Sequence, residues 1–286
     1  MPMAERNFRS QLTGSFSSPS KGNPTVAMVE AGYRHARLDA RFINCDVKPA
    51  NLEAAVRGAV AMEWVGFNCS LPHKVEVIKY LDDVAESASI IGAVNCVAIQ
   101  QGKLIGHNTD GKGFLSSLRS VTDPKGRKIV LLGAGGAARA IAVELGLAGA
   151  AHLTIVNRSR EKAEAIAKLV TEHTQATASA EGWSGDYAVS RDAEVLINAT
   201  SIGLGDPDAL PNIDLDSLRE GLIVADVIPN PPVTRLLREA KQRGCTTLDG
   251  LGMLVNQALV GTELWFGQKL DGAVMHKTLA DIFAQD

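Results

Sequence analysis

A lysine and an aspartate each follow a stretch that is typical of a buried strand. Lys74 ends residues 68–74 (NCSLPHK), and Asp110 lies in residues 108–111 (NTDG). Ligands of open α/β sheets bind at the carboxyl ends of strands, and Pro72 places Lys74 in an expected first helical turn. A carboxylate beside an amine orients it and stabilises its charged form, as proton transfer with a substrate hydroxyl requires. We predict Lys74 and Asp110 as a catalytic pair, against the alternatives of a solvated lysine and a helix cap.

Residues 128–140 (KIVLLGAGGAARA) join an apolar run to a small-residue helical pattern through a cluster of glycines. Gly133 allows the sharp turn out of a strand, and Gly135 has no Cβ to hold the backbone away from a diphosphate. Ala138 lets the helix pack closely on the sheet, and the free N–H groups at its start suit phosphate. Because a strand precedes the glycines and a helix follows them, we predict a dinucleotide site rather than a simple glycine turn.

The strand expected at residues 152–156 ends in Asn157 and Arg158. An NAD site usually has an acidic residue here that accepts from the ribose hydroxyl, whereas a guanidinium suits a 2′-phosphate. NADP is therefore favoured as the cofactor, and NAD is the alternative. Thr200 lies in a small polar loop (residues 198–203) that suits the nicotinamide half. The predicted cofactor-binding residues are Gly133, Ala134, Gly135, Gly136, Ala137, Asn157, Arg158, Thr200 and Gly250.

The pattern of apolar residues indicates an α/β protein in which strands and helices alternate. A linker is expected at residues 121–127, and a long helix is expected from residue 250 to about 270. The strands expected before the linker are 41–45, 64–70 and 91–99, with a helix at 51–61. Those expected after it are 128–132, 152–156, 194–198 and 222–226, with helices at 136–148 and 160–171.

Composition narrows the class of protein. The 286 residues carry a formal net charge of −3, so no broad positive field favours nucleic acid as a partner. No apolar run approaches the length of a membrane span, and residues 1–9 lack the apolar core of a signal peptide. The four cysteines form no CxxC pair, so we expect reduced thiols and no metal site. These features predict a cytoplasmic protein.

With these pieces placed, the chain resembles the shikimate dehydrogenase family over nearly its whole length. The matching motifs follow in the family's order at residues 68–74, 92–95, 108–111, 133–138, 157–158, 198–201 and 252–257. The resemblance implies a substrate-binding and catalytic domain at 1–115 and a Rossmann-type NADP domain at 116–249. It also implies that C-terminal helices at 250–286 return to the substrate domain.

The same resemblance implies the reaction and the residues around the substrate. Lys74 and Asp110 would assist hydride transfer between NADP and a cyclic hydroxy acid, in the 3-dehydroshikimate/shikimate step of aromatic amino-acid synthesis. Gln257 interrupts an apolar helical stripe, so its amide needs a partner, either a helix end or a ligand. A monomer or homodimer is expected. The predicted substrate-binding residues are Ser20, Asn68, Ser70, Asn95 and Gln257.

Two departures from the family pattern lie on the substrate side. The family's Ser-x-Ser-Pro motif binds the substrate carboxylate. Here Ser20 matches the first serine, but Gly22 or Asn23 stands at the position of the second. Pro229 replaces a tyrosine of the family's Asp-x-x-Tyr motif. We therefore hypothesise a paralogue that acts on quinate, an aminoshikimate or another ring polyol. An alternative of another class is a sensor that binds dinucleotide and ring acid without turnover. Retention of both Lys74 and Asp110 argues against the sensor.

Overall fold

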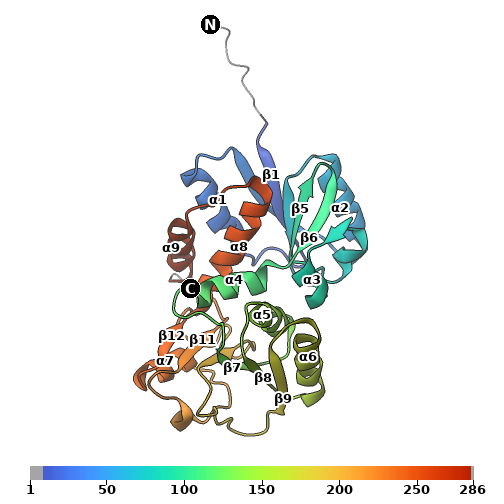
Figure 1. Cartoon of the computed structure of the whole chain (residues 1–286). Coiled ribbons are helices and arrows are strands. Elements are labelled where there is room, and N and C mark those ends of the chain that lie inside the picture. Colours follow the sequence, from blue (N-terminus) through green and yellow to red (C-terminus); the bar gives the residue numbers. More distant parts are fainter. Residues whose placement is uncertain (1–8, 285–286) are drawn as a thin grey trace.

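Two six-stranded sheets, stacked one above the other in Figure 1, form the framework of the molecule. The computed structural model describes residues 9–284. The first sheet has the order β2-β1-β3-β5-β6-β4, and the second has the order β12-β11-β10-β7-β8-β9. The predicted fold class, an α/β protein with a Rossmann-type half, is confirmed.

The first sheet mixes parallel and antiparallel pairs. Strands β2, β1 and β3 run parallel, whereas β5 is antiparallel to both β3 and β6. Gln101 and Gly102 have φ values of 53° and 77°, and these left-handed residues make the tight turn between β5 and β6. The strands are β1 (Gln11–Ser17), β2 (Ala40–Asp46), β3 (Gly66–Cys69), β4 (Asp83–Val84), β5 (Cys96–Gln100) and β6 (Lys103–His107). The helices between them are α1 (Thr25–His35), η1 (Pro49–Asn51), α2 (Leu52–Ala61), η2 (Glu76–Tyr80) and α3 (Glu86–Ile91).

The second sheet is wholly parallel, with α5 and α6 packed on one face and α7 on the other. Its central strands are therefore nearly continuous apolar runs. The chain moves from β7 outward to β8 and β9, and then returns to the other side of β7 at β10, which creates a topological switch point between β7 and β10. The strands are β7 (Lys128–Leu132), β8 (His152–Asn157), β9 (Thr177–Gly182), β10 (Val195–Asn198), β11 (Ile223–Asp226) and β12 (Thr246–Leu248). The helices are α5 (Gly136–Leu147), α6 (Arg160–His173), η3 (Leu215–Ser217) and α7 (Arg235–Gln242).

The last two helices, α8 (Gly250–Phe266) and α9 (Gly272–Phe283), pack on the first sheet. Val255, Trp265 and Met275 share an apolar core with Met28 and Phe42 of the α1–β2 region. The Trp265 Nε1 donates a hydrogen bond of 3.0 Å to the Val97 carbonyl oxygen of β5. The chain thus returns to its first half after completing the second sheet, as Figure 1 shows by the red helices beside α1.

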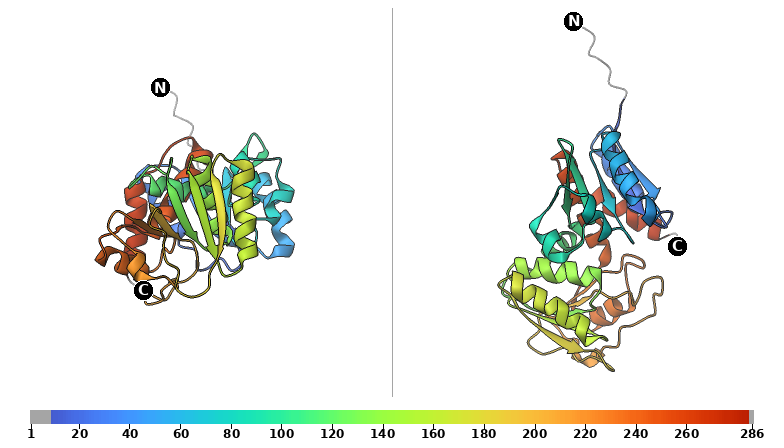
Figure 2. Two further views of the ribbon diagram at one scale, coloured as in Figure 1. Left: turned by 60° about the horizontal axis from the view of Figure 1, so that its bottom comes forward. Right: turned by 90° about the vertical axis from the view of Figure 1, so that its right-hand side faces the viewer.

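Helix α4 (Thr109–Leu118) lies at the junction of the two halves. A Cβ on Gly111 would lie 2.5 Å from the Ala140 oxygen of α5, and one on Gly113 would lie 2.6 Å from the Gln257 nitrogen of α8. These two glycines therefore let α4 approach one helix of each half. In the right-hand view of Figure 2, α5 lies between the second sheet and the elements of the first.

Several predicted elements differ from those observed. Residues 91–99 do not form one strand: α3 continues to Ile91, Gly92 ends it with a φ of 71°, and β5 begins only at Cys96. The apolar pair at the end of α3 fits either a strand or a helix, because short apolar runs do not distinguish them. The helix predicted from 250 to about 270 instead ends before Gly267, which has a φ of 68°.

Lys74 also does not lie in the first turn of a regular helix. Residues 71–75 form a series of turns, and the helical segment that follows is the short 3₁₀ helix η2. The expectation of a helix beginning at Pro72 is therefore wrong. Val94 N donates a 2.7 Å hydrogen bond to the Lys74 carbonyl oxygen, and this contact fixes the turn against the segment that precedes β5.

Candidate active site

Lys74 and Asp110 meet as predicted. The Lys74 Nζ lies 2.6 Å from the Asp110 Oδ2, and their side chains are 29% and 21% exposed. Lys74 comes from the turn after β3, and Asp110 comes from the first turn of α4, after β6. The capping role is taken by Asn108, whose side chain accepts from Gly111 N at 3.4 Å. Asp110 is therefore left to interact with Lys74.

Asn95 positions the other side of the Asp110 carboxylate. Its Nδ2 donates to Asp110 Oδ1 at 2.8 Å, and its Oδ1 accepts from Thr109 N at 2.6 Å. Asn68 Nδ2 donates to the Asn95 carbonyl oxygen at 3.1 Å. Asn95 is almost fully buried, so these contacts are shielded from water. The carboxylate consequently has a fixed orientation with one oxygen directed at the lysine.

A cavity of about 200 Å³ opens in front of this pair. Gln257 borders it, with its Nε2 donating to Leu254 O at 3.0 Å and its Oε1 accepting from the Thr109 hydroxyl at 3.4 Å. The amide on the apolar stripe of α8 thus has protein partners and also reaches the cavity. The lining residues are Ser15, Asn23, Thr25, Asn68, Cys69, Ser70, Lys74, Asn95, Asp110, Leu254 and Gln257.

Four of the five predicted substrate-binding residues line this cavity, and Ser20 does not. Ser20 is buried outside it, and Asn23 borders the cavity instead. The Asn23 Nδ2 donates to Ser15 Oγ at 3.2 Å, and its Oδ1 accepts from Thr25 N at 3.0 Å. Ser15 and Thr25 also line the cavity, although neither is among the predicted substrate-binding residues. Strand β1 runs on to Ser17, so Ser15 is held by the sheet.

The polar groups of the cavity are almost all neutral. Among its lining residues, all within the described part of the chain, Lys74 is the sole cation and Asp110 the sole anion. The remaining polar side chains are hydroxyls, amides and one thiol. Burial raises the pKa of the Cys69 thiol to about 12, so the sulfur stays protonated and is a poor nucleophile. Lys74 and Asp110 are therefore the charged side chains of the lining that could take part in proton transfer.

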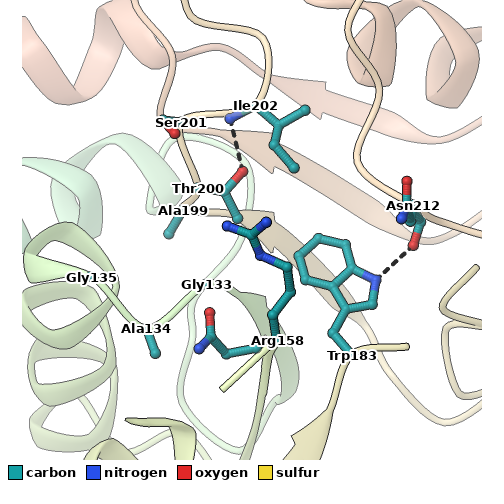
Figure 3. Close-up of a pocket in the computed structure, with 11 residues that line it drawn as sticks. Gly133, Ala134, Gly135, Arg158, Trp183, Ala199, Thr200, Ser201, Ile202 and Asn212 are labelled. Carbon is teal, nitrogen blue, oxygen red and sulfur yellow. Dashed lines mark hydrogen bonds between the residues drawn. The ribbon is translucent and has the colours of Figure 1, made fainter. Parts of the chain in front are cut away.

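A second cavity, of about 540 Å³, lies at the carboxyl ends of β7, β8 and β10 (Figure 3). Gly133 has a φ of 105°, and a Cβ there would lie 2.9 Å from the Ala199 oxygen. A Cβ on Gly135 or Gly136 would meet no atom within 4 Å, so the backbone at the start of α5 is open to a ligand. The cavity's lining residues are Gly133, Ala134, Gly135, Asn157, Arg158, Trp183, Ala199, Thr200, Ser201, Ile202 and Asn212.

Two cationic side chains beside this glycine turn are unpaired within the described residues. The side chains of Arg158 and Lys162 form no hydrogen bond or ion pair within residues 9–284, and both line a smaller cavity of about 280 Å³. That cavity also includes Ala134, Gly135 and Ser159. Open backbone N–H groups at a helix start and two free cations fit a dinucleotide that carries an additional phosphate.

Six of the nine predicted cofactor-binding residues line the large cavity, and three do not. Gly136 and Ala137 lie in the first turn of α5, behind the glycine turn. A Cβ on Gly250 would lie 2.3 Å from the Ile228 oxygen, so the close packing of α8 accounts for this glycine. Thr200 lines the cavity and shapes its loop, because its hydroxyl donates to Asn198 Oδ1 at 2.7 Å and accepts from Ile202 N at 3.0 Å.

A buried carboxylate joins the ends of two strands beside this cavity. Asp226 accepts from Asn198 Nδ2 at 3.1 Å, from the Thr234 hydroxyl at 2.8 Å and from Ile228 N at 3.1 Å. Burial raises the pKa of Asp226 to about 6, against the opposing effect of these donors. The network fixes the end of β10, where the loop containing Thr200 begins.

Other kinds of site are not evident in the described residues. No group of three or more His, Cys, Asp or Glu side chains there is arranged to hold a metal ion. Within residues 9–284, no helix combines the length and apolar character that a membrane span requires.

Comparison with known proteins matches three family profiles to successive parts of the chain. They are the shikimate dehydrogenase substrate binding domain at residues 18–97, shikimate/quinate 5-dehydrogenase at 117–202 and the shikimate 5′-dehydrogenase C-terminal domain at 250–280. A shikimate dehydrogenase (NADP(+)) of Methanopyrus kandleri is 40% identical over 275 residues, which cover 94% of this chain and 95% of the relative.

Two solved structures are similar over nearly the whole chain. The ligand-free 5-ketofructose reductase of Gluconobacter sp. strain CHM43 is 67% identical, with a TM-score of 0.96 and coverage of 97% of this chain and 100% of the other. The shikimate 5-dehydrogenase of Thermus thermophilus, in complex with NADP(H) and shikimate, is 32% identical with a TM-score of 0.83. That match covers 95% of this chain and 99% of the other.

Proposed function

This chain belongs to the shikimate dehydrogenase family, and we propose that it is an NADP-dependent oxidoreductase. The enzyme would interconvert a ketone and an alcohol on a small polyhydroxylated substrate. The bound cofactor would supply or accept the hydride. The glycine turn, Arg158 and Lys162 support NADP, because they combine open backbone with two uncommitted cations. Arg158 and Lys162 would hold the 2′-phosphate, and the start of α5 would face the diphosphate.

The observation that carries this proposal is the 2.6 Å contact between Lys74 and Asp110 at the wall of the smaller cavity. During reduction, the Lys74 ammonium would donate a proton to the carbonyl oxygen while hydride reaches the carbonyl carbon, and a proton from solvent would restore the ammonium. Asp110 would keep the amine oriented, and Asn95 would keep Asp110 in place. Oxidation of the alcohol uses the same groups in reverse.

For the substrate, we propose an uncharged keto-sugar of about hexose size, with 5-ketofructose as the first compound to test. The 67% identity to a 5-ketofructose reductase supports this class. So does the cavity, in which the one cation is already paired with Asp110. Gly22 or Asn23 stands where the family pattern has its second carboxylate-binding serine, Asn23 is the one of the two that lines the cavity, and Pro229 replaces the tyrosine. An amide that can donate and accept suits a hydroxyl or carbonyl better than a carboxylate.

A second candidate is the 3-dehydroshikimate/shikimate pair. It is supported by the curated relatives and by Asn68, Ser70, Asn95 and Gln257, which all line the cavity. The family resemblance assigns Asn95 and Gln257 to the substrate hydroxyls, with Ser70 and Asn68 beside them. The two candidates differ mainly in the group that faces Asn23: a carboxylate in one case and a neutral hydroxyl or carbonyl in the other.

The test follows NADPH absorbance with purified protein and either 5-ketofructose or 3-dehydroshikimate. We expect kcat/KM for 5-ketofructose to exceed that for 3-dehydroshikimate by at least about 10²-fold, because the wrong substrate leaves polar groups of the site unpaired. The opposite ratio would favour the second candidate. Absence of NADPH oxidation with both substrates and with a panel of keto-sugars and ring ketones would contradict the dehydrogenase proposal.

Asn23→Ser provides a sharper test of the substrate class. Restoring a serine should lower kcat/KM for 5-ketofructose by about tenfold, as expected for loss of one polar contact. It should also raise the relative activity on 3-dehydroshikimate. Asn51→Ser, at the exposed start of α2 and outside the cavity, is the matched control. Equal activities for Asn23→Ser and the control would show that Asn23 does not determine which substrate is preferred.

A further inference from the structure

Trp183 forms one wall of the larger cavity, although it belongs to no motif recognised in the sequence. It directly follows β9, and its backbone N donates to the Asn157 carbonyl oxygen at 3.0 Å. This contact places Trp183 beside the segment that carries Arg158. Figure 3 shows the Arg158 side chain reaching up next to the indole, on the side toward the glycine turn.

The indole is fixed in place by the protein itself. Its Nε1 donates to the Asn212 carbonyl oxygen at 2.8 Å, and the same oxygen accepts from Tyr187 N at 2.9 Å. The ring also packs against the apolar core on that face of the second sheet, which includes Leu132 and Val156. The orientation of Trp183 is therefore set without a ligand.

With its N–H already used, the indole can offer the cavity only its aromatic surface and edges. A half-buried aromatic ring in the wall of a cavity suits a flat, unsaturated ring, because stacking needs no hydrogen-bond pairing. A dinucleotide contains two such rings, adenine and nicotinamide. Position decides between them: Trp183 lies next to Arg158, on the side proposed for the 2′-phosphate of the adenosine ribose. Thr200 and Ser201, at the end of β10, lie on the side expected for nicotinamide.

We propose that Trp183 stacks on the adenine of NADP and contributes directly to cofactor affinity. The inference rests on the proposed function, since it takes the cavity to be a dinucleotide site. Trp183 would thus contribute to cofactor affinity in addition to the glycine turn and Arg158, and it lies in a segment that follows an edge strand. Base–aromatic stacking of this kind changes affinity by about 10- to 100-fold.

Intrinsic fluorescence isolates this residue. The other two tryptophans, Trp64 and Trp265, are only 5% and 8% exposed and lie in the cores of the first half, away from the cavity. A change in emission on cofactor binding is therefore expected to come from Trp183. We expect NADP and adenosine 2′,5′-bisphosphate to quench the emission, and nicotinamide mononucleotide to leave it unchanged.

Two variants complete the test. Trp183→Ala should raise the Kd for NADP and for adenosine 2′,5′-bisphosphate by about 10- to 100-fold, and should raise KM for NADPH while kcat stays near the wild-type value. Trp183→Phe should lose the fluorescence response but keep affinity within a few-fold, because a phenyl ring still stacks.

Wild-type affinity in Trp183→Ala, or quenching by nicotinamide mononucleotide alone, would overturn the adenine assignment while leaving the dehydrogenase proposal intact. If the wild-type protein bound neither NADP nor NAD in calorimetry, both proposals would fall together. If Trp183→Ala does not fold, the fluorescence titrations of the wild-type protein with adenosine 2′,5′-bisphosphate and nicotinamide mononucleotide still test the adenine assignment.

Discussion

The side-chain amide of Asn95 donates to one oxygen of Asp110 at 2.8 Å, which leaves the other oxygen to Lys74 at 2.6 Å. The carboxylate is thereby held from two sides by residues from different segments. A carboxylate that served only to neutralise the charge of Lys74 would not need this fixed orientation. From this arrangement we predict that removing the Lys74 amine lowers the catalytic rate.

Lys74→Met should lower kcat by about 10²- to 10⁴-fold, the range expected when a general acid is removed. The Kd for NADPH should change little, because Lys74 does not line the larger cavity. Stopped-flow or steady-state NADPH absorbance gives the rate, and calorimetry gives the affinity. Lys79→Met is the control, since Lys79 is exposed and paired only with Glu76. Equal rates for the two variants would exclude Lys74 as the proton donor.

Arg158→Asp should shift cofactor preference from NADPH toward NADH. The substitution puts a carboxylate where a free guanidinium faces the site proposed for the 2′-phosphate, so NADPH is repelled and a ribose hydroxyl can donate to the new residue. We expect the ratio of kcat/KM for NADPH to that for NADH to fall by about 10²-fold or more.

Arg160→Asp is the matched control for that change. It removes an exposed arginine two positions away that is paired with Glu164 and does not line either cavity at this end of the sheet. A comparable loss of preference in both variants would mean that the effect is general electrostatics and not recognition by Arg158.

Gly66→Ala should destabilise the protein strongly. The added Cβ would lie 2.2 Å from Trp265 Nε1 and 2.5 Å from the Val97 oxygen, so it would break the hydrogen bond that attaches α8 to β5. We expect a loss of about 3 kcal/mol in the free energy of unfolding, at the upper end for overpacking. Urea denaturation followed by circular dichroism measures it.

Gly58→Ala provides the contrast. Gly58 lies inside α2, and its Cβ would make only an ordinary 3.9 Å contact with Met62. Alanine there should stabilise by about 0.5–1 kcal/mol through its higher helix propensity. If the two alanine variants had similar stability, the close packing of Trp265 on β3 would be contradicted.

Asp226 should make stability fall as pH rises from about 4 to about 6. Burial raises its folded-state pKa to about 6, above the unfolded value of about 3.9, so within this window the native state binds the proton and the unfolded state does not. The difference of about 2 pKa units corresponds to about 3 kcal/mol of native-state stability, present below pH 4 and lost above pH 6.

Urea midpoints of the wild type and of Asp226→Asn at pH 4.5 and 7 check this effect. The variant should be less sensitive to pH across the window, whatever its absolute stability, because asparagine does not titrate. An identical pH dependence in both proteins would show that the carboxyl does not titrate in this range.

The family and its main motifs could be predicted because they are local in sequence. The glycine turn, Asn157–Arg158 and the segments around Lys74 and Asp110 each carry their chemistry within a few residues, and their order identified the family. The family, the α/β fold and the dehydrogenase class are confirmed. The NADP-dependent relatives agree with the cofactor expected from Arg158.

What could not be predicted depends on contacts between distant segments. Trp183 follows β9, an edge strand with few apolar residues, and its orientation depends on a carbonyl 29 positions later. The segment after β1 brings Asn23 rather than Ser20 to the cavity, and this placement follows from no local propensity. Gly250 stays a prediction as a cofactor-binding residue, and close packing against Ile228, a residue distant in sequence, by itself accounts for a glycine there.

The segment from β1 to the start of α1 contributes Ser15, Asn23 and Thr25 to the cavity, but it takes no part in the ion pair of Lys74 and Asp110. Part of the cavity wall is thus encoded in a stretch of the gene separate from the ion pair, whereas Asn68, Ser70 and Asn95 lie in the same segments as Lys74 and Asp110. Mutations in one short segment can explore new sugars or ring acids while the proton donor stays aligned. Such modularity makes this scaffold evolvable, and directed evolution should therefore begin by randomising residues 15–25.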